Sequence, residues 1–184
     1  MKKMLACIAV GILAACNTNP SKDESTSSTK DTTMAAPAAI QSPDYPIAYS
    51  SDFVRDDPAN AESLLKLWKV WDEGDLSKGK DLFADNDTMY LADGSVMKGP
   101  RDSIIAASQR YRSSLGSSVS RVDAITTLKS VDRNTHWALI WGMEKDSANG
   151  KVDSFYLQET WRFNKDGKAD LLLQFRRSAP SGKK

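Results

Sequence analysis

The clearest pattern along the chain is a helical repeat of apolar residues that begins soon after residue 57. Asp57-Pro58 is a typical helix start, because aspartate can cap a first turn and proline fits its first position. An apolar stripe with helical spacing follows, made of Ala61, Leu64, Leu65, Trp68 and Trp71. We therefore predict a helix that ends near Gly74, with this stripe facing the core.

Three shorter elements are predicted before residue 119. Residues 76–83 favour a second helix, and residues 88–92 alternate as a short strand. A third helix is predicted to start after Gly99-Pro100 and to stop at Gly116. Its expected inner stripe is Ile104, Ser108, Tyr111 and Leu115.

From about Val119 onward, apolar and polar residues alternate with period two, which predicts three or four long strands. Asn149-Gly150 and Asp166-Gly167 are strong signals for two-residue hairpin turns. With these turns, Glu159 faces Ile140 on one neighbouring strand and Gln174 on the other. One sheet face then carries Ala138, Ile140, Gly142, Leu157, Trp161, Phe163 and Leu172, together with Glu159, Gln174 and Arg176. The other face carries Trp137, Leu139, Trp141 and Met143 beside Tyr156, Gln158, Thr160 and Arg162.

This order of elements predicts an α+β domain over residues 51–180. Three N-terminal helices are expected to pack on one side of a curved antiparallel sheet. Residues 181–184 are expected to form a disordered tail.

The start of the chain predicts where in the cell the protein is located. Lys2-Lys3 precedes an apolar run that ends at Ala15, shorter than the roughly 20 residues a membrane span needs, so residues 1–15 indicate a signal peptide. Leu13-Ala14-Ala15-Cys16 resembles the lipobox of bacterial lipoproteins, in which cleavage precedes the cysteine and the thiol is acylated. We expect Cys16 to be the lipidated residue; an ordinary signal peptide with an incidental cysteine is the alternative.

Residues 16–50 then predict a disordered tether, because Ser, Thr and Pro dominate and apolar surface is scarce. Asn17 stands where an aspartate would resemble an inner-membrane retention signal. The expected location is therefore the bacterial cell envelope, with a lipid anchor in the outer membrane and the domain facing the periplasm or the surface.

Composition excludes several classes of function. Lys and Arg number 25 against 24 Asp and Glu, so the clustered positive charge of a nucleic-acid-binding protein is missing. One histidine and two cysteines leave almost nothing for a metal site, and we expect no metal and no cofactor. His136 is expected to be a strand-end residue, too far from Glu159 to form a catalytic dyad.

Four short motifs together carry a family resemblance over residues 55–178. They are Trp71-Asp72-Glu73-Gly74-Asp75-Leu76, Leu82-Phe83-Ala84-Asp85, Asp93-Gly94 with Lys98-Gly99-Pro100-Arg101, and Trp161-Arg162-Phe163-Asn164-Lys165-Asp166-Gly167-Lys168. In order and spacing they resemble the SnoaL-like branch of the nuclear transport factor 2-like superfamily. The resemblance implies a conical fold enclosing a pocket, and often a homodimer through the outer sheet face, for which Trp137 and Trp141 are candidates.

The superfamily includes ketosteroid isomerases, and the resemblance can be followed residue by residue. Glu159, four residues before Phe163, stands where those enzymes have an oxyanion-binding acid. Leu91 and Leu67 stand where they have the general-base aspartate and the oxyanion tyrosine, and Arg176 where many have an aromatic wall. Only one of three catalytic positions can ionise, which disfavours steroid-type isomerisation.

The candidate site is centred on Glu159. Arg176 lies one diagonal away on the predicted sheet, so the two are expected to pair, with Gln174 bridging them. Such a group would anchor the carboxylate or carbonyl of a small hydrophobic ligand; a purely structural ion pair is the alternative. Further pocket candidates are Trp161, Leu157, Ile140, Leu172, Leu91, Tyr90 and Tyr111.

Three functions remain open. The favoured one is a lipid-anchored envelope protein whose pocket binds a small hydrophobic molecule without catalysis. The second is an acid/base enzyme of isomerase, cyclase or hydrolase type, using Glu159 with Tyr90 or Tyr111. The third is a protein-interaction module that uses the outer sheet face.

Overall fold

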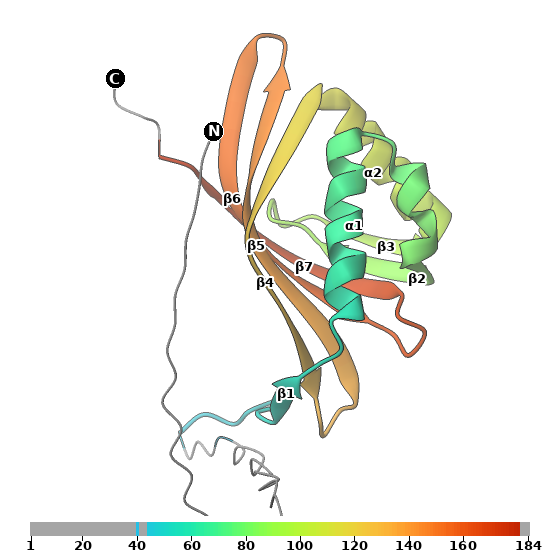
Figure 1. Cartoon of the computed structure of the whole chain (residues 1–184), viewed down its shortest axis with the longest axis vertical. Coiled ribbons are helices and arrows are strands. Elements are labelled where there is room, and N and C mark those ends of the chain that lie inside the picture. The colour runs from blue at the N-terminus through green and yellow to red at the C-terminus, as the bar shows by residue number, and fades with distance from the viewer. Residues whose placement is uncertain (1–39, 41–43, 181–184) are drawn as a thin grey trace, which may run out of the picture. The chain divides into compact units, whose positions relative to one another are not determined.

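A mixed β-sheet forms one layer of the domain, and helices cover one of its faces (Figure 1). The computed structural model describes residue 40 and residues 44–180. The predicted signal peptide, Cys16, most of the tether and residues 181–184 lie outside the described residues. All described residues belong to one compact unit, Ala36–Lys184.

The described part of the chain contains seven strands and three helices. In chain order they are β1 (Phe53–Arg55), α1 (Ala59–Glu73), η1 (Leu76–Leu82), β2 (Phe83–Tyr90), β3 (Val96–Pro100), α2 (Arg101–Ser114), β4 (Ser117–Ser130), β5 (Thr135–Ala148), β6 (Lys151–Phe163) and β7 (Ala169–Ser178). The strand order across the sheet is β1-β4-β5-β6-β7-β2-β3. Helix α1 packs against β4 and β5, and α2 packs against β2 and β3.

The first helix agrees closely with its prediction. The Asp57 carboxylate accepts a hydrogen bond of 2.9 Å from the Ala59 N–H, which caps the first turn. Gly74 ends the helix with a φ of 80°, a left-handed conformation that favours glycine. The buried apolar side chains are Leu64, Leu67 and Trp68, so the inward stripe includes Leu67 in place of the exposed Leu65.

The other two predicted helices need correction in detail. Residues 76–82 form a 3-10 helix, and β2 begins at Phe83, five residues before the predicted strand. Helix α2 has the expected bounds, but Tyr111 is exposed and Arg112 is buried. The Arg112 guanidinium donates to the main-chain oxygens of Trp71 (2.6 Å), Asp72 (3.1 Å) and Gly116 (2.9 Å). This arginine therefore ties the end of α2 to the end of α1.

The prediction of an entirely antiparallel sheet is wrong. β2 runs parallel to β7, with Met89 opposite Leu172. The two strands lie about eighty residues apart in the chain, so no local turn motif predicts that they pair. Two short edge strands, β1 and β3, were also not predicted.

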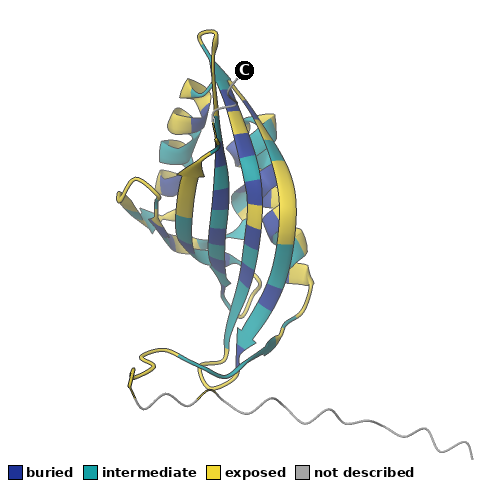
Figure 2. Ribbon diagram, turned by 90° about the vertical axis from the view of Figure 1, so that its left-hand side faces the viewer, coloured by how far each residue is buried: buried dark blue, intermediate teal, exposed yellow. Residues whose placement is uncertain are grey.

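The predicted register of the long hairpins is confirmed. Glu159 on β6 lies opposite Ile140 on β5 and opposite Gln174 on β7. The Asn149-Gly150 turn is the predicted two-residue hairpin, with Ala148 opposite Lys151. The second turn is one residue longer than predicted, because it is closed by a main-chain hydrogen bond between Asn164 and Lys168, and a register shift between Arg162 and Phe163 compensates for the extra residue. The apolar face assigned from the sequence is the inner face that packs on the helices. Buried positions alternate with more exposed ones along these strands (Figure 2).

The outer face of the sheet carries the two tryptophans proposed for a dimer contact. Trp141 is 37% exposed. Trp137 is half-buried, because Tyr49 covers part of its ring through an edge-on contact with 5.9 Å between ring centroids. Tyr49 also accepts a hydrogen bond of 2.9 Å at its main-chain oxygen from Arg133, so contacts with the domain begin before residue 51.

Candidate functional site

A cavity of about 400 Å³ lies between the helices and the inner sheet face. Its walls come from α1, η1, β2, the β2–β3 loop, β3, α2 and the four long strands. Most lining side chains are apolar or aromatic, and its four charged residues are Asp93, Glu144, Glu159 and Arg176. A mainly apolar cavity with a few polar groups is typical of a small-molecule site.

Glu159 projects from the centre of β6 into this cavity and is 5% exposed. Its Oε2 accepts hydrogen bonds from the indole N–H of Trp68 (2.8 Å) and of Trp161 (2.9 Å). Its Oε1 accepts a third, of 2.9 Å, from the side-chain amide of Gln174. Both carboxyl oxygens therefore act as acceptors, and all three donors are neutral groups.

The predicted pairing of Glu159 with Arg176 is wrong. The Arg176 guanidinium lies over the ring of Phe155, at 4.6 Å from its centroid, and its side chain is exposed at the cavity rim. The two indoles and Gln174 occupy the Glu159 oxygens instead, which strand alternation alone could not reveal because Trp68 belongs to α1. Gln174 does act as a bridge, but toward the β2–β3 loop, where its amide oxygen accepts from the Ala92 N–H at 3.4 Å.

The cavity rim carries one charged pair of opposite sign. Asp93 in the β2–β3 loop accepts from the Ser95 hydroxyl at 2.6 Å, and this bond chiefly lowers the pKa of the Asp93 carboxyl. The charge of Arg176 lowers the same pKa further. Positive and negative charge therefore meet at the exposed end of the cavity.

A second buried carboxyl group, Glu144, also lines the cavity. It lies on the inner face of β5, opposite Phe155, and is 7% exposed. Burial is the main reason why its pKa is raised to about 8; the charges of Asp146, Glu159 and Asp72 and a hydrogen bond with Asp146 act in the same direction. Glu144 is therefore mostly protonated at pH 7.

Sequence reasoning missed Glu144, although a signal was present. The alternation Ala138, Ile140, Gly142 on the inner face of β5 reaches Glu144 two residues further on. The predicted face stopped at Gly142, so the second acid was never assigned to the same face as Glu159.

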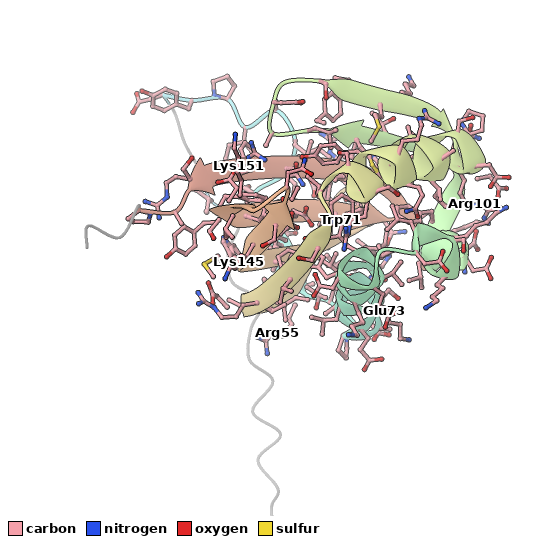
Figure 3. All side chains as sticks on the ribbon, turned by 90° about the horizontal axis from the view of Figure 1, so that it is seen from above. Arg55, Trp71, Glu73, Arg101, Lys145 and Lys151 are labelled. Carbon is pink, nitrogen blue, oxygen red and sulfur yellow. The ribbon has the colours of Figure 1, made fainter. Side chains whose placement is uncertain are left out.

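Several polar atoms in or next to the cavity lining are buried without a hydrogen-bond partner among the described residues. Nε1 of Trp71 belongs to the cavity lining, whereas Oδ1 of Asp146 and Oγ of Ser118 lie outside it. Trp71 lies near the end of α1 (Figure 3). Its ring is tilted against that of Tyr111 of α2, at 6.2 Å between ring centroids. The cavity lining thus combines aromatic surface with one unmatched donor, the Trp71 indole N–H.

The remaining predicted pocket residues divide into two groups. Trp161, Leu157, Leu172, Leu91 and Tyr111 line the cavity. Ile140 is fully buried in the core and does not reach the cavity, and Tyr90 is 48% exposed away from it. Tyr90 is therefore not positioned to act with Glu159.

His136 lies near the start of β5, as expected. Its Nδ1 is 2.8 Å from Oδ2 of Asp56, at the junction between β1 and α1, and it does not line the cavity. Within residues 44–180, no three His, Cys, Asp or Glu side chains are grouped so as to hold a metal ion. In the same part of the chain, no helix combines the length and hydrophobicity needed to cross a membrane.

Comparison with solved structures identifies the fold of the domain. No protein-family model and no curated protein matches the chain. Among solved structures, it is similar to a protein named as a SnoaL-like polyketide cyclase from Jannaschia sp. CCS1, with a TM-score of 0.55, 9% identity, and coverage of 65% of this chain and 86% of that one. The chain has a nuclear transport factor 2-like α+β fold.

Two further structures support the same fold. An LEH-like epoxide hydrolase of M. tuberculosis aligns with a TM-score of 0.54 and 9% identity, over 65% of this chain and 83% of that one. An NTF2-like protein of unknown function from Exiguobacterium sp. 255-15 aligns with a TM-score of 0.51 and 17% identity, over 64% of this chain and 99% of that one. Identities this low establish the nuclear transport factor 2-like architecture and leave the chemistry to the cavity itself.

Proposed function

We propose that this protein binds a small hydrophobic molecule in the cavity between its helices and its sheet. The observation that carries the proposal is the 400 Å³ apolar cavity with Glu159 held rigidly at its wall by Trp68, Trp161 and Gln174. A fixed polar group in an apolar pocket orients a ligand while the walls supply most of the affinity. No step of this function requires a reaction.

The proposal includes a place in the cell. The lipobox-like sequence ending at Cys16 supports a lipid anchor, and the Ser/Thr/Pro-rich segment supports a tether that holds the domain away from the outer membrane. The exposed rings of Trp141 and Phe175 on the outer sheet face support a homodimer through that face. Globomycin-sensitive processing and metabolic labelling with a palmitate analogue, lost in Cys16→Ser, would test the anchor.

Ligand binding itself is tested by blocking the cavity. Ala107 on α2 lines it, whereas its neighbour Ala106 is exposed and does not. A neutral probe, 2-naphthylmethanol, should raise the melting temperature of the wild type and of Ala106→Phe, because a ligand that binds the folded state stabilises it. Ala107→Phe should abolish the shift. If neutral, cationic and anionic naphthyl probes all leave the melting temperature unchanged, the proposal fails.

An acid/base enzyme is the second candidate, and Glu144 is the observation that favours it. Its raised pKa keeps a proton available at pH 7, while Glu159 presents acceptor oxygens elsewhere in the same cavity. Phe155, opposite Glu144, lies four residues from Glu159 along β6, roughly 13 Å by ordinary strand rise, so the two acids would act on different ends of a substrate. Two carboxyl groups in contrasting environments are a common basis for general acid and general base roles. Two structural neighbours carry the names of a polyketide cyclase and an epoxide hydrolase.

This second candidate makes a distinct prediction. Glu144→Gln and Glu159→Gln should each abolish turnover of an epoxide or polyketide-type substrate while circular dichroism shows that each variant is folded at the assay temperature. Turnover that survives both substitutions would exclude these carboxyl groups from the chemistry.

A further inference from the structure

The buried ionisable side chains that line the cavity are all acidic. Glu144 and Glu159 are the buried ionisable residues that line it, and both are acids. Arg176, the lining cation, lies at the exposed rim over Phe155. Arg112 is buried nearby, but its N–H groups are directed to three main-chain oxygens and it does not line the cavity. Within the described residues, the interior thus holds two carboxyl groups and no cation of its own.

Glu144 is buried without a cation among the described residues to pair with its carboxyl group. Buried carboxyl groups are normally paired with a cation or held in the neutral form. Asp72 of α1, Asp146 of β5 and Glu159 of β6 all act on Glu144 with negative charge, and no charge among those that shift its pKa is positive. Glu144 instead keeps its proton and shares a hydrogen bond with Asp146.

Asp146 adds a further buried acid behind Glu144. Asp146 is 7% exposed, and its Oδ1 has no hydrogen-bond partner within residues 44–180. It lies two residues beyond Glu144 on the same face of β5, outside the residues that line the cavity. Its negative charge acts on Glu144, and Glu144 is the acid of this pair that a ligand in the cavity can reach.

The aromatic lining of the cavity as a whole suits a cation as well. Trp68, Trp71, Tyr111 and Trp161 line it, and the Arg112 guanidinium already lies over the Trp71 ring, at 5.9 Å from its centroid. Aromatic rings attract cations through their electron-rich faces, and the attraction grows when water is excluded. A ligand carboxylate would instead face two buried acids, so the anionic ligand expected from a Glu159–Arg176 pair is disfavoured.

We propose that the ligand is a hydrophobic amine, whose protonated nitrogen lies beside Glu144, within the negative field of Glu159, and whose apolar body fills the aromatic part of the cavity. This inference rests on the proposed binding function and specifies its ligand class. An ammonium group brings up to three N–H donors, which the carboxyl oxygens of Glu144 can accept.

The proposal implies a proton exchange. Glu144 is protonated in the free protein at pH 7, and an ammonium ion beside it favours the carboxylate. Binding therefore converts a carboxylic acid and an ammonium ion into an ion pair and releases one proton to the buffer. A neutral ligand of the same shape releases none.

A matched series of probes tests this directly. The probes are 2-naphthylmethylamine, 2-naphthylmethanol and 2-naphthoate, titrated by calorimetry at pH 7 into the wild-type protein in two buffers of different ionisation enthalpy. We expect the amine to bind at least about tenfold more tightly than the alcohol, equivalent to about 1.4 kcal/mol, and the carboxylate to bind most weakly. The buffer dependence should show release approaching one proton for the amine alone.

Variants assign the effect to the two acids. Glu144→Gln should reduce the preference for the amine over the alcohol to less than about threefold and abolish proton release. Glu159→Gln should lower amine affinity without abolishing proton release. Glu62→Gln, an exposed position on α1 outside the cavity, should behave as the wild type.

The outcomes separate this inference from the binding function on which it rests. If the alcohol or the carboxylate binds as tightly as the amine, the amine proposal is overturned and the binding function stands. If none of the probes binds, both fail. If Glu144→Gln does not fold, the order of the three probe affinities and the proton release in the wild type test the amine proposal.

Discussion

The indole N–H of Trp68 on α1 donates a hydrogen bond of 2.8 Å to the carboxylate of Glu159 on β6. This bond joins the helix layer to the sheet at the wall of the cavity, across ninety-one positions of the chain. It also accounts for a buried carboxylate without a cationic partner, because neutral donors satisfy its oxygens. The geometry of the cavity therefore depends on side chains from both layers.

Removing the indole donor of α1 should destabilise the domain. Trp68→Phe retains most of the apolar volume but leaves Oε2 of Glu159 with one donor in place of two. We expect a loss of about 1–3 kcal/mol in the free energy of unfolding, measured with a chemical denaturant.

Trp161→Phe is the matched control, since it removes the other donor to the same oxygen. Because both indoles serve one atom, the double variant should lose more than the sum of the two single losses. Strict additivity would show that the two bonds do not support the carboxylate jointly.

A methyl group at Gly142 should disturb the same contact from the sheet side. A Cβ at this position would lie 2.4 Å from the main-chain oxygen of Arg121 and 2.7 Å from the Trp68 ring. Gly142→Ala should therefore cost about 3 kcal/mol and shift tryptophan fluorescence as the ring moves. At Gly79 a Cβ would approach only side-chain methyl groups, the nearest at 3.3 Å, so Gly79→Ala should cost clearly less.

Glu144 should make stability depend on pH. Its pKa is about 8 in the folded protein and 4.5 in its ordinary state, so between these values the unfolded chain binds fewer protons than the folded one. The free energy of unfolding should then fall as pH rises from 5 to 8. Urea titrations should show a flatter dependence across this window for Glu144→Gln; an equal slope would contradict the assignment.

Asp87 on β2 should add a second dependence at lower pH. It is 3% exposed, its Oδ2 has no hydrogen-bond partner among the described residues, and burial raises its pKa from 3.8 to about 6. The free energy of unfolding should therefore fall as pH rises from 4 to 6, because the unfolded chain binds fewer protons than the folded protein in this range. Asp87→Asn should remove this component and leave the one between pH 6 and 8, whereas Asp153→Asn at an exposed position should change neither.

Local signals were enough to predict the part of the fold that presents Glu159. Asn149-Gly150 specifies a two-residue turn that fixes the pairing of β5 with β6. Asp166-Gly167 marks the position of the second turn, which is one residue longer than predicted, and a register shift beside Phe163 restores the predicted pairing of Glu159 with Gln174. The first helix was equally accessible, because Asp57 and Gly74 mark its ends with local chemistry.

What could not be predicted depends on contacts between distant segments. The Trp68 donor and the parallel pairing of β2 with β7 join elements separated by some eighty to ninety residues, and no short-range pattern encodes them. Arg176 was expected beside Glu159 because a diagonal sheet position permits it. The helix side chains above the sheet decided the outcome, and they gave both Glu159 oxygens other donors.

The position of β7 between β6 and β2 has a consequence for how the protein is made. β7 is the last strand in the sequence, yet it lies inside the sheet, and β2 and β3 join the long strands only through it. Until residues 169–178 have been synthesised, the β2–β3 hairpin has no partner among β4, β5 and β6. The cavity, which takes walls from both β2 and β7, thus forms only when the chain is nearly complete, and nascent chains that stop before residue 169 cannot hold a ligand there.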